Sequence, residues 1–389
     1  MGRPIVAKGI RRRGVLALAA GVGIPAGASR AFASDRAGAG SREIVIGQTA
    51  DLSGPLGGAM RAFNAGAQLA FGQVNAEGGV HQRALRLVTL DDEMKPEKAA
   101  QNCAALLARH RAFAFFGAAG NSSFEATIPF LREHEVPLVG NYGLSDAARS
   151  KAVGAAYFVR AGFGREAERL IQHMASVGIT RIGLAYMNVS EGVEVLQRIQ
   201  AVSGQLGSKV ELVRAEAVRL DGADAASAAR RLAASEVQAV VLFLSGAPAI
   251  EFVKSIEDAG ARPAYYGLSV LHGELLAKGL DSKFRGFAIS QVVPYPWSEA
   301  DATASTFRNS IVAATTVTYA SYEGYINGLI LIEGLKRSGQ TLTRRSFHSA
   351  IRSIRGQIAG LHVDFTSESP TASRFVEIVH VTRQGRFLR

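Results

Sequence analysis

Three consecutive acidic residues, Asp91, Asp92 and Glu93, are the strongest candidates for chemistry in this sequence. Clustered carboxylates can transfer protons as a general acid and base, or bind a divalent metal ion. These three follow an apolar run and precede Lys95-Pro96, which is also the pattern of a strand that ends in solvated acids beside a turn. We favour this second interpretation and predict no metal site.

Motifs of known catalytic chemistry do not occur after residue 33. The sequence there contains no His-x-x-x-His, no Gly-x-Ser-x-Gly and no phosphate-binding loop. The eight histidines are isolated, and Cys103, the one cysteine, has no second thiol for a disulfide or a cysteine-rich metal site. We therefore predict that the protein is not an enzyme and uses no cofactor, and we keep an enzyme as the first alternative.

Short apolar runs alternate with longer helical patterns from Arg42 onward. Four of these runs predict the strands of one sheet, at Glu43–Thr49, Leu85–Leu90, Ala112–Gly117 and Val136–Val139. The pattern then restarts with strands predicted at Tyr157–Arg160, Arg181–Tyr186, Val210–Val213 and Ala239–Leu244. Such alternation indicates parallel sheets covered by helices, so we predict an α/β fold with two Rossmann-like lobes. Near the end, Leu361–Phe365 and Phe375–Val381 flank a polar turn and predict a hairpin.

The loops that follow the predicted strands are the places to look for a ligand. In open parallel sheets, ligands bind beyond the carboxyl ends of the strands. These loops are rich in Gly, Ser, Asn and Tyr, which suit directional hydrogen bonds to a small polar molecule. One loop of this composition is ordinary, but several loops expected at the same edge of the sheets have it. Ser122 and Glu125 predict a capping box, and the N-terminus of that helix is a place for an anionic group.

The first 33 residues have the layout of an export signal. A basic start precedes an apolar stretch from Gly14 to Ala28, and small residues at Ala31 and Ala33 suit a signal peptidase. Arg12-Arg13 resembles a twin-arginine signal, and the apolar stretch is shorter than the roughly 20 residues of a membrane-spanning helix. We predict a periplasmic protein with its signal peptide, 1–33, cleaved after about Ala33; a retained membrane anchor is the alternative.

The net charge of +11 overstates how basic the mature protein is. Six of the 44 basic residues lie in 1–33, which has no acidic residue, and this leaves 38 basic against 33 acidic residues, a net charge of +5. The remaining charges are scattered and form no basic stripe with interleaved aromatics, so the sequence does not favour nucleic-acid binding.

Five stretches of the mature sequence, in a fixed order, carry a family resemblance. They are Ile46–Pro55, Asn75–Val80 with Leu85–Asp92 after it, Val136–Gly140, Gln291–Pro294 and Tyr322–Tyr325. Their order and spacing resemble the periplasmic substrate-binding proteins of ABC transporters. The similarity is to the branched-chain amino acid (Leu/Ile/Val) binding protein-like family, which has the type I periplasmic binding fold. It extends over most of 42–389.

The resemblance implies two discontinuous lobes joined by a three-segment hinge. Lobe one would comprise 42–160 and 291–357, and lobe two would comprise 161–290 and 358–389. A small ligand would bind between the lobes, and closure of the hinge would enclose it. An inner-membrane ABC permease would recognise the closed form. We expect a monomer that binds no nucleic acid.

Eight residues are the candidate ligand contacts. Lobe one would supply Asn121, Ser122, Tyr142, Gly143 and Ser145, and lobe two would supply Ser190, Glu191 and Ser269. The resemblance implies that relatives which bind α-amino acids have, at the position of Ser269, the acid that pairs with the ligand ammonium. Burying an ammonium without a carboxylate costs on the order of several kcal/mol. Unless Glu191 substitutes, we therefore favour a small organic or aromatic carboxylate over an amino acid.

A second alternative keeps the fold and changes its use. A receptor that senses its ligand for signalling would capture and enclose it in the same way, so the residues of the cleft do not separate signalling from transport.

The export signal yields a first prediction. Replacing Arg12 and Arg13 with Lys should keep the unprocessed precursor inside the cell, because twin-arginine export depends on the arginine pair. Immunoblots of periplasmic and cytoplasmic fractions would measure this. Unchanged periplasmic mature protein would contradict the twin-arginine route and leave export by the general pathway.

Overall fold

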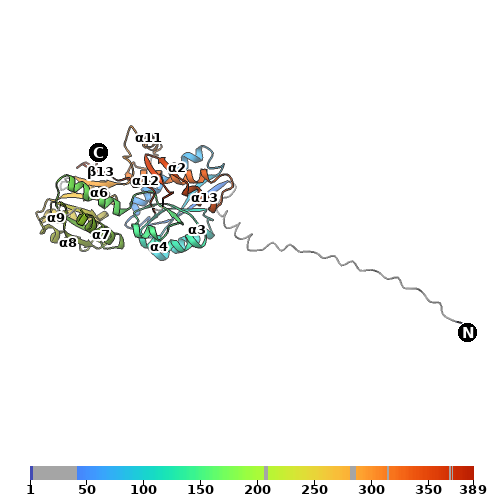
Figure 1. Ribbon diagram of the computed structural model, residues 1–389, viewed down its shortest axis with the longest axis horizontal. Coiled ribbons are helices and arrows are strands. Elements are labelled where there is room, and N and C mark those ends of the chain that lie inside the picture. Colours follow the sequence, from blue (N-terminus) through green and yellow to red (C-terminus); the bar gives the residue numbers. More distant parts are fainter. Residues whose placement is uncertain (3–41, 206–208, 281–285, 313–314, 368, 370) are drawn as a thin grey trace.

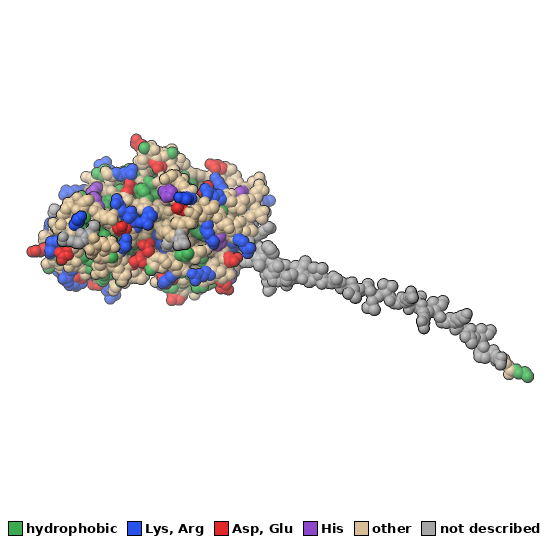
Figure 2. Space-filling model, in the orientation of Figure 1, with side chains coloured by type: hydrophobic (Ala, Val, Ile, Leu, Met, Phe, Trp, Pro, Cys, Tyr) green, Lys and Arg blue, Asp and Glu red, His purple; other side chains and the backbone are tan. Residues whose placement is uncertain are grey.

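The computed structural model describes residues 1–2, 42–205, 209–280, 286–312, 315–367, 369 and 371–389. The predicted signal peptide, apart from its first two residues, lies outside this described part. The chain forms two α/β lobes side by side (Figure 1), as the strand–helix alternation predicted. Basic and acidic side chains are interspersed over the face that Figure 2 shows.

A five-stranded parallel sheet forms the core of lobe one, in the order β2-β1-β3-β4-β5. Every residue of β3 and β4 is buried, which explains why these runs are apolar throughout rather than alternating. The strands are β1 Glu43–Ala50, β2 Ala84–Asp91, β3 Ala114–Ala119, β4 Leu138–Tyr142 and β5 Ala156–Tyr157. The helices of this lobe are α2 Gly57–Ala76, α3 Pro96–Ala108, α4 Asn121–Glu133, α5 Asp146–Ser150, α11 Ala302–Asn309, α12 Tyr319–Arg337 and α13 Arg344–Arg352.

Lobe two has a seven-stranded sheet in the order β14-β13-β10-β9-β8-β6-β7. Its first five strands in sequence are parallel to one another, and β13 and β14 are added antiparallel at one edge. The strands are β6 Arg181–Met187, β7 Glu211–Val218, β8 Ala239–Phe243, β9 Ala264–Gly267, β10 Phe287–Gln291, β13 Glu377–Val381 and β14 Phe387–Leu388. The helices are α6 Phe163–Ser176, α7 Ser190–Gln205, α8 Ala225–Ala233, α9 Gly246–Asp258 and α10 Gly273–Leu280.

The predicted hairpin of Leu361–Phe365 with Phe375–Val381 is wrong. Strand β12 (Leu361–Asp364) pairs instead with β11 (Arg355–Ile358), and β13 pairs with β10 and β14. Ala359 and Gly360 both have positive φ, at 52° and 75°, which is the backbone of the tight turn that suits a two-residue hairpin. The partner of β12 is therefore β11, the strand just before it in the sequence. The Ala-Gly pair that joins them is not one of the residue pairs typical of such a turn.

The chain passes between the two sheets three times. It leaves the first sheet after β5, leaves the second after β10, and returns to the second with β13. The first and third passages run together, because the N–H of Ala372 donates to the carbonyl of Phe158 and that of Ser373 to the carbonyl of Val159. The pairing of β12 with β11 favours a third passage near these residues over the predicted one near 358. The residue limits of the two lobes stay a prediction.

Two helices of lobe one, α2 and α12, approach each other unusually closely. A Cβ atom at Gly66 would lie 1.7 Å from the carbonyl oxygen of Ser321, and one at Gly324 would lie 1.8 Å from that of Phe63. Glycine is therefore required at both positions, since any side chain would collide with backbone. The contact fixes the position of Glu323, the residue before Gly324, at the junction of the lobes.

A buried ion cluster occupies that junction. The guanidinium of Arg160, on the first passage, lies 2.9 Å from Glu166 Oε1 on α6 and 3.2 Å from Glu323 Oε1 on α12. Glu166 Oε2 also accepts hydrogen bonds from the N–H of Ser269, at 2.8 Å, and from the hydroxyl of Ser290, at 2.8 Å. Buried charges are tolerated when they are paired and hydrogen-bonded, and these bonds tie residues of both lobes to one cation.

Burial raises the pKa of Glu323 to about 7, although nearby Arg160 pulls it down. The folded protein therefore holds a proton that the unfolded chain releases near its ordinary value of 4.5. Between these two pH values the folded state binds more protons than the unfolded state, so the free energy of unfolding falls as the pH rises.

Replacing Glu323 with Gln should remove this pH dependence. We expect the slope of unfolding free energy against pH, measured by chemical denaturation from pH 5 to pH 8, to become flatter in Glu323→Gln. Glu333→Gln changes a half-exposed carboxylate on the same helix, which is paired with Arg337, and serves as the control. An equal slope in wild type and Glu323→Gln would contradict the assignment.

Candidate ligand-binding site

A cavity of about 580 Å³ lies between the lobes, at the carboxyl ends of β3 and β4 in lobe one and of β6 and β8 in lobe two. This is the edge of a parallel sheet where ligands bind. Both lobes therefore contribute to one site, which is partly open to solvent. Its lining is Pro55, Leu56, Glu93, Met94, Gly120, Asn121, Ser122, Ser123, Gly143, Phe163, Met187, Val189, Ser190, Glu191, Leu220, Phe243, Ser245 and Val270.

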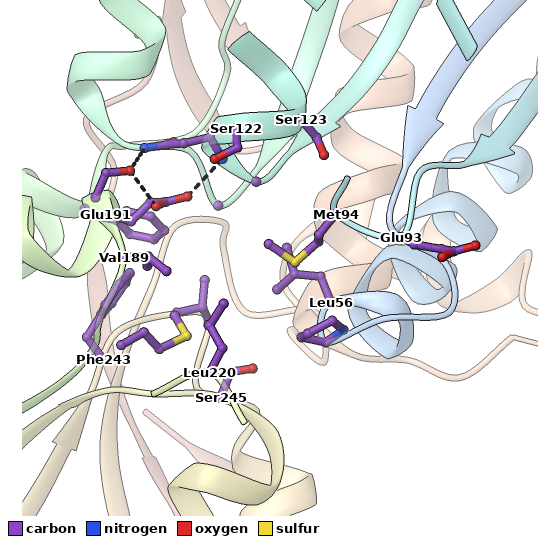
Figure 3. Close-up of a pocket in the computed structure, with 18 residues that line it drawn as sticks. Leu56, Glu93, Met94, Ser122, Ser123, Val189, Glu191, Leu220, Phe243 and Ser245 are labelled. Carbon is purple, nitrogen blue, oxygen red and sulfur yellow. Dashed lines mark hydrogen bonds between the residues drawn. The ribbon is translucent and has the colours of Figure 1, made fainter. Parts of the chain in front are cut away.

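Much of the cavity wall is apolar. Leu56 and Met94 of lobe one face Val189, Leu220 and Phe243 of lobe two across the cavity (Figure 3). A wall of this kind stabilises the apolar part of a ligand by removing its surface from water, at roughly 25 cal/mol per Å². The site therefore favours a ligand with an apolar body over a sugar-like one.

The polar end of the cavity lies at the N-terminus of α4. The chain enters this helix through Gly120, whose φ of 68° belongs to the region that favours glycine. The predicted capping box is wrong, because the helix begins at Asn121 and no side chain of its own caps it. Glu191 of lobe two takes this role instead, and its Oε1 accepts a hydrogen bond of 2.9 Å from the N–H of Asn121.

Asn121 links three of the predicted residues. Its amide nitrogen donates to Ser145 Oγ at 2.8 Å and to Ser190 Oγ at 3.0 Å, and its amide oxygen accepts from the N–H of Ser145 at 3.1 Å. Ser190 in turn donates to Glu191 Oε2 at 3.0 Å. The side chain of Asn121 thus positions the cavity wall and connects the lobes.

A second carboxylate of α7 makes a similar contact outside the cavity. Glu194 accepts hydrogen bonds from the N–H groups of Asp146, at 2.7 Å, and Ala147, at 2.9 Å, which open α5. Glu191 and Glu194 are three residues apart and so lie on one face of the helix. Each therefore binds the positive N-terminal end of a lobe-one helix, and together they connect the lobes across the cleft.

The three consecutive acids Asp91, Asp92 and Glu93 have structural partners. Asp91 accepts hydrogen bonds from the N–H of Leu52 and the hydroxyl of Ser53. Asp92 is buried rather than solvated, burial raises its pKa, and it accepts from the hydroxyl of Thr49. Glu93 lines the cavity, but its carboxylate points away from it (Figure 3) and pairs with Lys95 at 2.7 Å and with Lys98. Over the described residues, no group of three or more His, Cys, Asp or Glu side chains is placed to hold a metal ion.

Five of the eight predicted residues line the cavity, namely Asn121, Ser122, Gly143, Ser190 and Glu191. The other three lie behind its wall. Ser145 caps α5 by accepting from the N–H of Ala148 at 3.1 Å. The ring of Tyr142 packs against Phe63, with centroids 6.1 Å apart, and carries the guanidinium of Arg160 over it at 5.5 Å.

Ser269, the residue expected at the place of an ammonium-binding acid, belongs to the buried ion cluster. Its hydroxyl contacts both Arg160 and Glu166. With Tyr142 it borders a separate, smaller cavity of about 210 Å³. The family resemblance located the loop, but the N–H and the hydroxyl of Ser269 are already bound by Glu166 of α6.

The apolar wall residues Leu56, Met94, Leu220 and Phe243 were missed in the sequence analysis. Phe243 ends β8 and Leu220 follows β7, so both lie at the strand ends where the search was directed. That search gave weight only to polar residues. An apolar residue at the end of a strand could have been recognised as a candidate for the cavity wall.

Residues 43–386 match the family model described as periplasmic binding protein. The chain is similar to a substrate-binding periplasmic protein from Ralstonia solanacearum, with 25% identity, a TM-score of 0.82 and coverage of 89% of this chain and 99% of that one.

Two further solved structures share the fold at lower identity. One is an ABC transporter solute-binding protein from R. palustris in complex with benzoate, with 18% identity, a TM-score of 0.76 and coverage of 89% and 95% of the two chains. The other is a branched-chain amino acid ABC transporter protein from Thermus thermophilus with bound valine, with 15% identity, a TM-score of 0.78 and coverage of 90% and 95%. The curated proteins gave no match. In the described part of the chain, no helix has the length and apolar character to cross a membrane.

Gly120 offers a test of how the polar end is built. Gly120→Ala should lower the unfolding free energy by about 1–3 kcal/mol, the cost of a backbone conformation that residues with a side chain rarely adopt, and its Cβ would also lie 3.2 Å from the Met94 methyl. Gly72→Ala, in the exposed middle of α2 with open space around it, should instead stabilise by up to about 1 kcal/mol. Chemical denaturation measures both. Equal effects of the two changes would contradict the role of Gly120.

Proposed function

The chain belongs to the periplasmic binding protein family, and we propose that it is the exported solute receptor of an ABC importer. It captures one small molecule between its lobes, closes over it, and presents the closed form to an inner-membrane permease. We propose a monomer that acts by binding rather than by catalysis. The observation that carries the proposal is the cavity at the strand ends, to which both lobes contribute.

Closure fits the contacts that connect the lobes. Glu191 and Glu194 reach lobe one only through hydrogen bonds to helix N-termini, and the three chain passages allow the lobes to rotate about the junction near Arg160. A ligand that contacts both walls adds to the stability of the closed form. The permease then distinguishes loaded from empty receptor by shape.

We propose a ligand with an apolar body and a small polar end. The apolar wall formed by Leu56, Met94, Val189 and Phe243 supports the body, and the helix α4 N-terminus with its serine hydroxyls supports the polar end. Similar folds bind benzoate and valine, each an apolar group with a polar end. The sequence favoured a carboxylate ligand, but the N–H of Asn121, a donor that such a ligand would use, is already bound by Glu191.

Thermal melting of residues 34–389 tests the proposal directly. The panel comprises amino acids, small carboxylates, aromatic acids, amides, amines and sugars. A ligand at 100 times its dissociation constant should stabilise the protein by about 2.7 kcal/mol. Stabilisation by one chemical class would support the receptor, and silence across the panel would contradict it.

A pair of substitutions at the start of α7, one just before the helix and one on it, tests whether binding takes place in this cavity. Val189→Trp should fill the cavity and weaken binding of any ligand found by at least tenfold, because Val189 faces Leu56 and Met94 across it. Val193→Trp is the control, since Val193 lies one turn further along and is 40% exposed. Isothermal titration calorimetry measures both. Unchanged affinity in Val189→Trp, or equal losses in the two variants, would place the ligand elsewhere.

A further inference from the structure

The polar end of the cavity already contains an anion, the carboxylate of Glu191. Its Oε1 accepts the N–H of Asn121 at 2.9 Å and its Oε2 accepts the hydroxyl of Ser190 at 3.0 Å (Figure 3). Glu191 also lies in the first turn of its own helix, α7. It is therefore held between the positive ends of two helices, where a carboxylate is stabilised.

This position is the one that a ligand carboxylate would use. The first N–H groups of a helix have no partner inside the helix and commonly bind anions. In α4 the first of these groups, the N–H of Asn121, is taken by Glu191. A second carboxylate placed there would lose that donor and would stand beside a negative charge in a partly enclosed site, where like charges repel strongly.

The rest of the described lining offers a ligand anion no cationic side chain. Among the described residues that border the cavity, none is Lys, Arg or His. Arg160, a buried cation of the junction, does not line the cavity; it lies over the ring of Phe163, 5.8 Å from its centroid, and contacts Glu166 and Glu323. Its charge is balanced inside that cluster by the carboxylate of Glu166.

Glu191 has capacity for a ligand that donates hydrogen bonds. Each carboxylate oxygen has two lone-pair sites, and the contacts to Asn121 and Ser190 use one on each oxygen. Both of these donors are neutral groups, so the charge of Glu191 is not cancelled by a cation there. A ligand ammonium would supply the missing positive charge, and an amide would supply a neutral donor.

We propose, on the basis of the proposed receptor function, that Glu191 is the specificity-determining residue of the cavity. It selects ligands with an apolar body and a protonated amine, accepts the matching primary amide less well, and discriminates against the matching free carboxylate. The amine, the amide and the carboxylate of a matched series share one apolar body, which the apolar wall binds equally. The end group alone therefore decides the order of affinity.

Matched probes separate the end group from the body. We suggest benzylamine, benzamide and benzoate, together with the corresponding hexyl and cyclohexyl series, titrated calorimetrically into residues 34–389. Within each series that binds, wild type should bind the amine at least tenfold more tightly than the carboxylate, with the amide between them.

Variants of Glu191 test its part in that order. Glu191→Ala removes the acceptor and frees the N–H of Asn121, so the amine-to-carboxylate affinity ratio should fall at least tenfold. Glu191→Gln keeps the size of the side chain and removes the charge, so the ratio should fall while amide binding changes least. The conservative variant keeps the test usable if the alanine variant folds poorly.

Glu194→Gln is the matched control. Glu194 connects the lobes in the same way as Glu191, but it does not line the cavity. Its loss should weaken all three probes of a series by the same factor and leave their order unchanged.

The outcomes distinguish this inference from the proposed function. Tighter binding of carboxylates by wild type, or an unchanged ratio in both Glu191 variants, would overturn the role of Glu191 and leave the receptor function standing. Binding of only a sugar or another class without an apolar body would do the same. Silence of these probes and of the whole melting panel would overturn the receptor function itself.

Discussion

The buried contact of Arg160 with Glu166 and Glu323 is the constraint on which the rest of the structure depends. A guanidinium withdrawn from water is tolerated only if carboxylates and hydrogen bonds replace the solvent. One carboxylate comes from α6 of lobe two and the other from α12 of lobe one. Arg160 lies on a passage between the sheets, so the need to balance its charge also fixes how the two lobes are placed relative to each other. Phe163 begins α6, packs against Arg160 and lines the cavity, so the position of this part of the wall depends on the cluster.

A second buried arginine supports the same junction. Arg149 donates to the carbonyls of Leu144 and Arg160 and to the hydroxyl of Thr371, and burial lowers its pKa to about 10. It therefore joins the loop after β4 to the first and third passages. With both arginines in place, the cavity is bordered by parts of the chain whose positions depend on buried charges rather than on loop conformation alone.

The fold was largely predictable from the sequence, while the site was predictable only as a location. Apolar runs separated by helical patterns report burial on both faces of a parallel strand, and β1, β3 and β8 appeared where those runs indicated. Residues after such strands lie at one edge of the sheet, which is why Asn121 and Gly143 were found. Partners from the other lobe leave no local pattern. Glu191 at the α4 N-terminus and Glu166 beside Ser269 are contacts over 70 and 103 residues of sequence, and neither could be derived from spacing.

The way in which the lobes are connected also bears on how this protein can diverge. Both Glu191 and Glu194 bind backbone N–H groups, those of Asn121, Asp146 and Ala147, and not side chains of lobe one. Every amino acid except proline carries that donor, so lobe one can change side chains at these helix starts without losing the two acceptors. Proline is ordinarily welcome as the first residue of a helix, because the N–H that it lacks has no partner there. At Asn121, the first residue of α4, proline would preserve the helix and still remove the N–H group that Glu191 binds across the cleft.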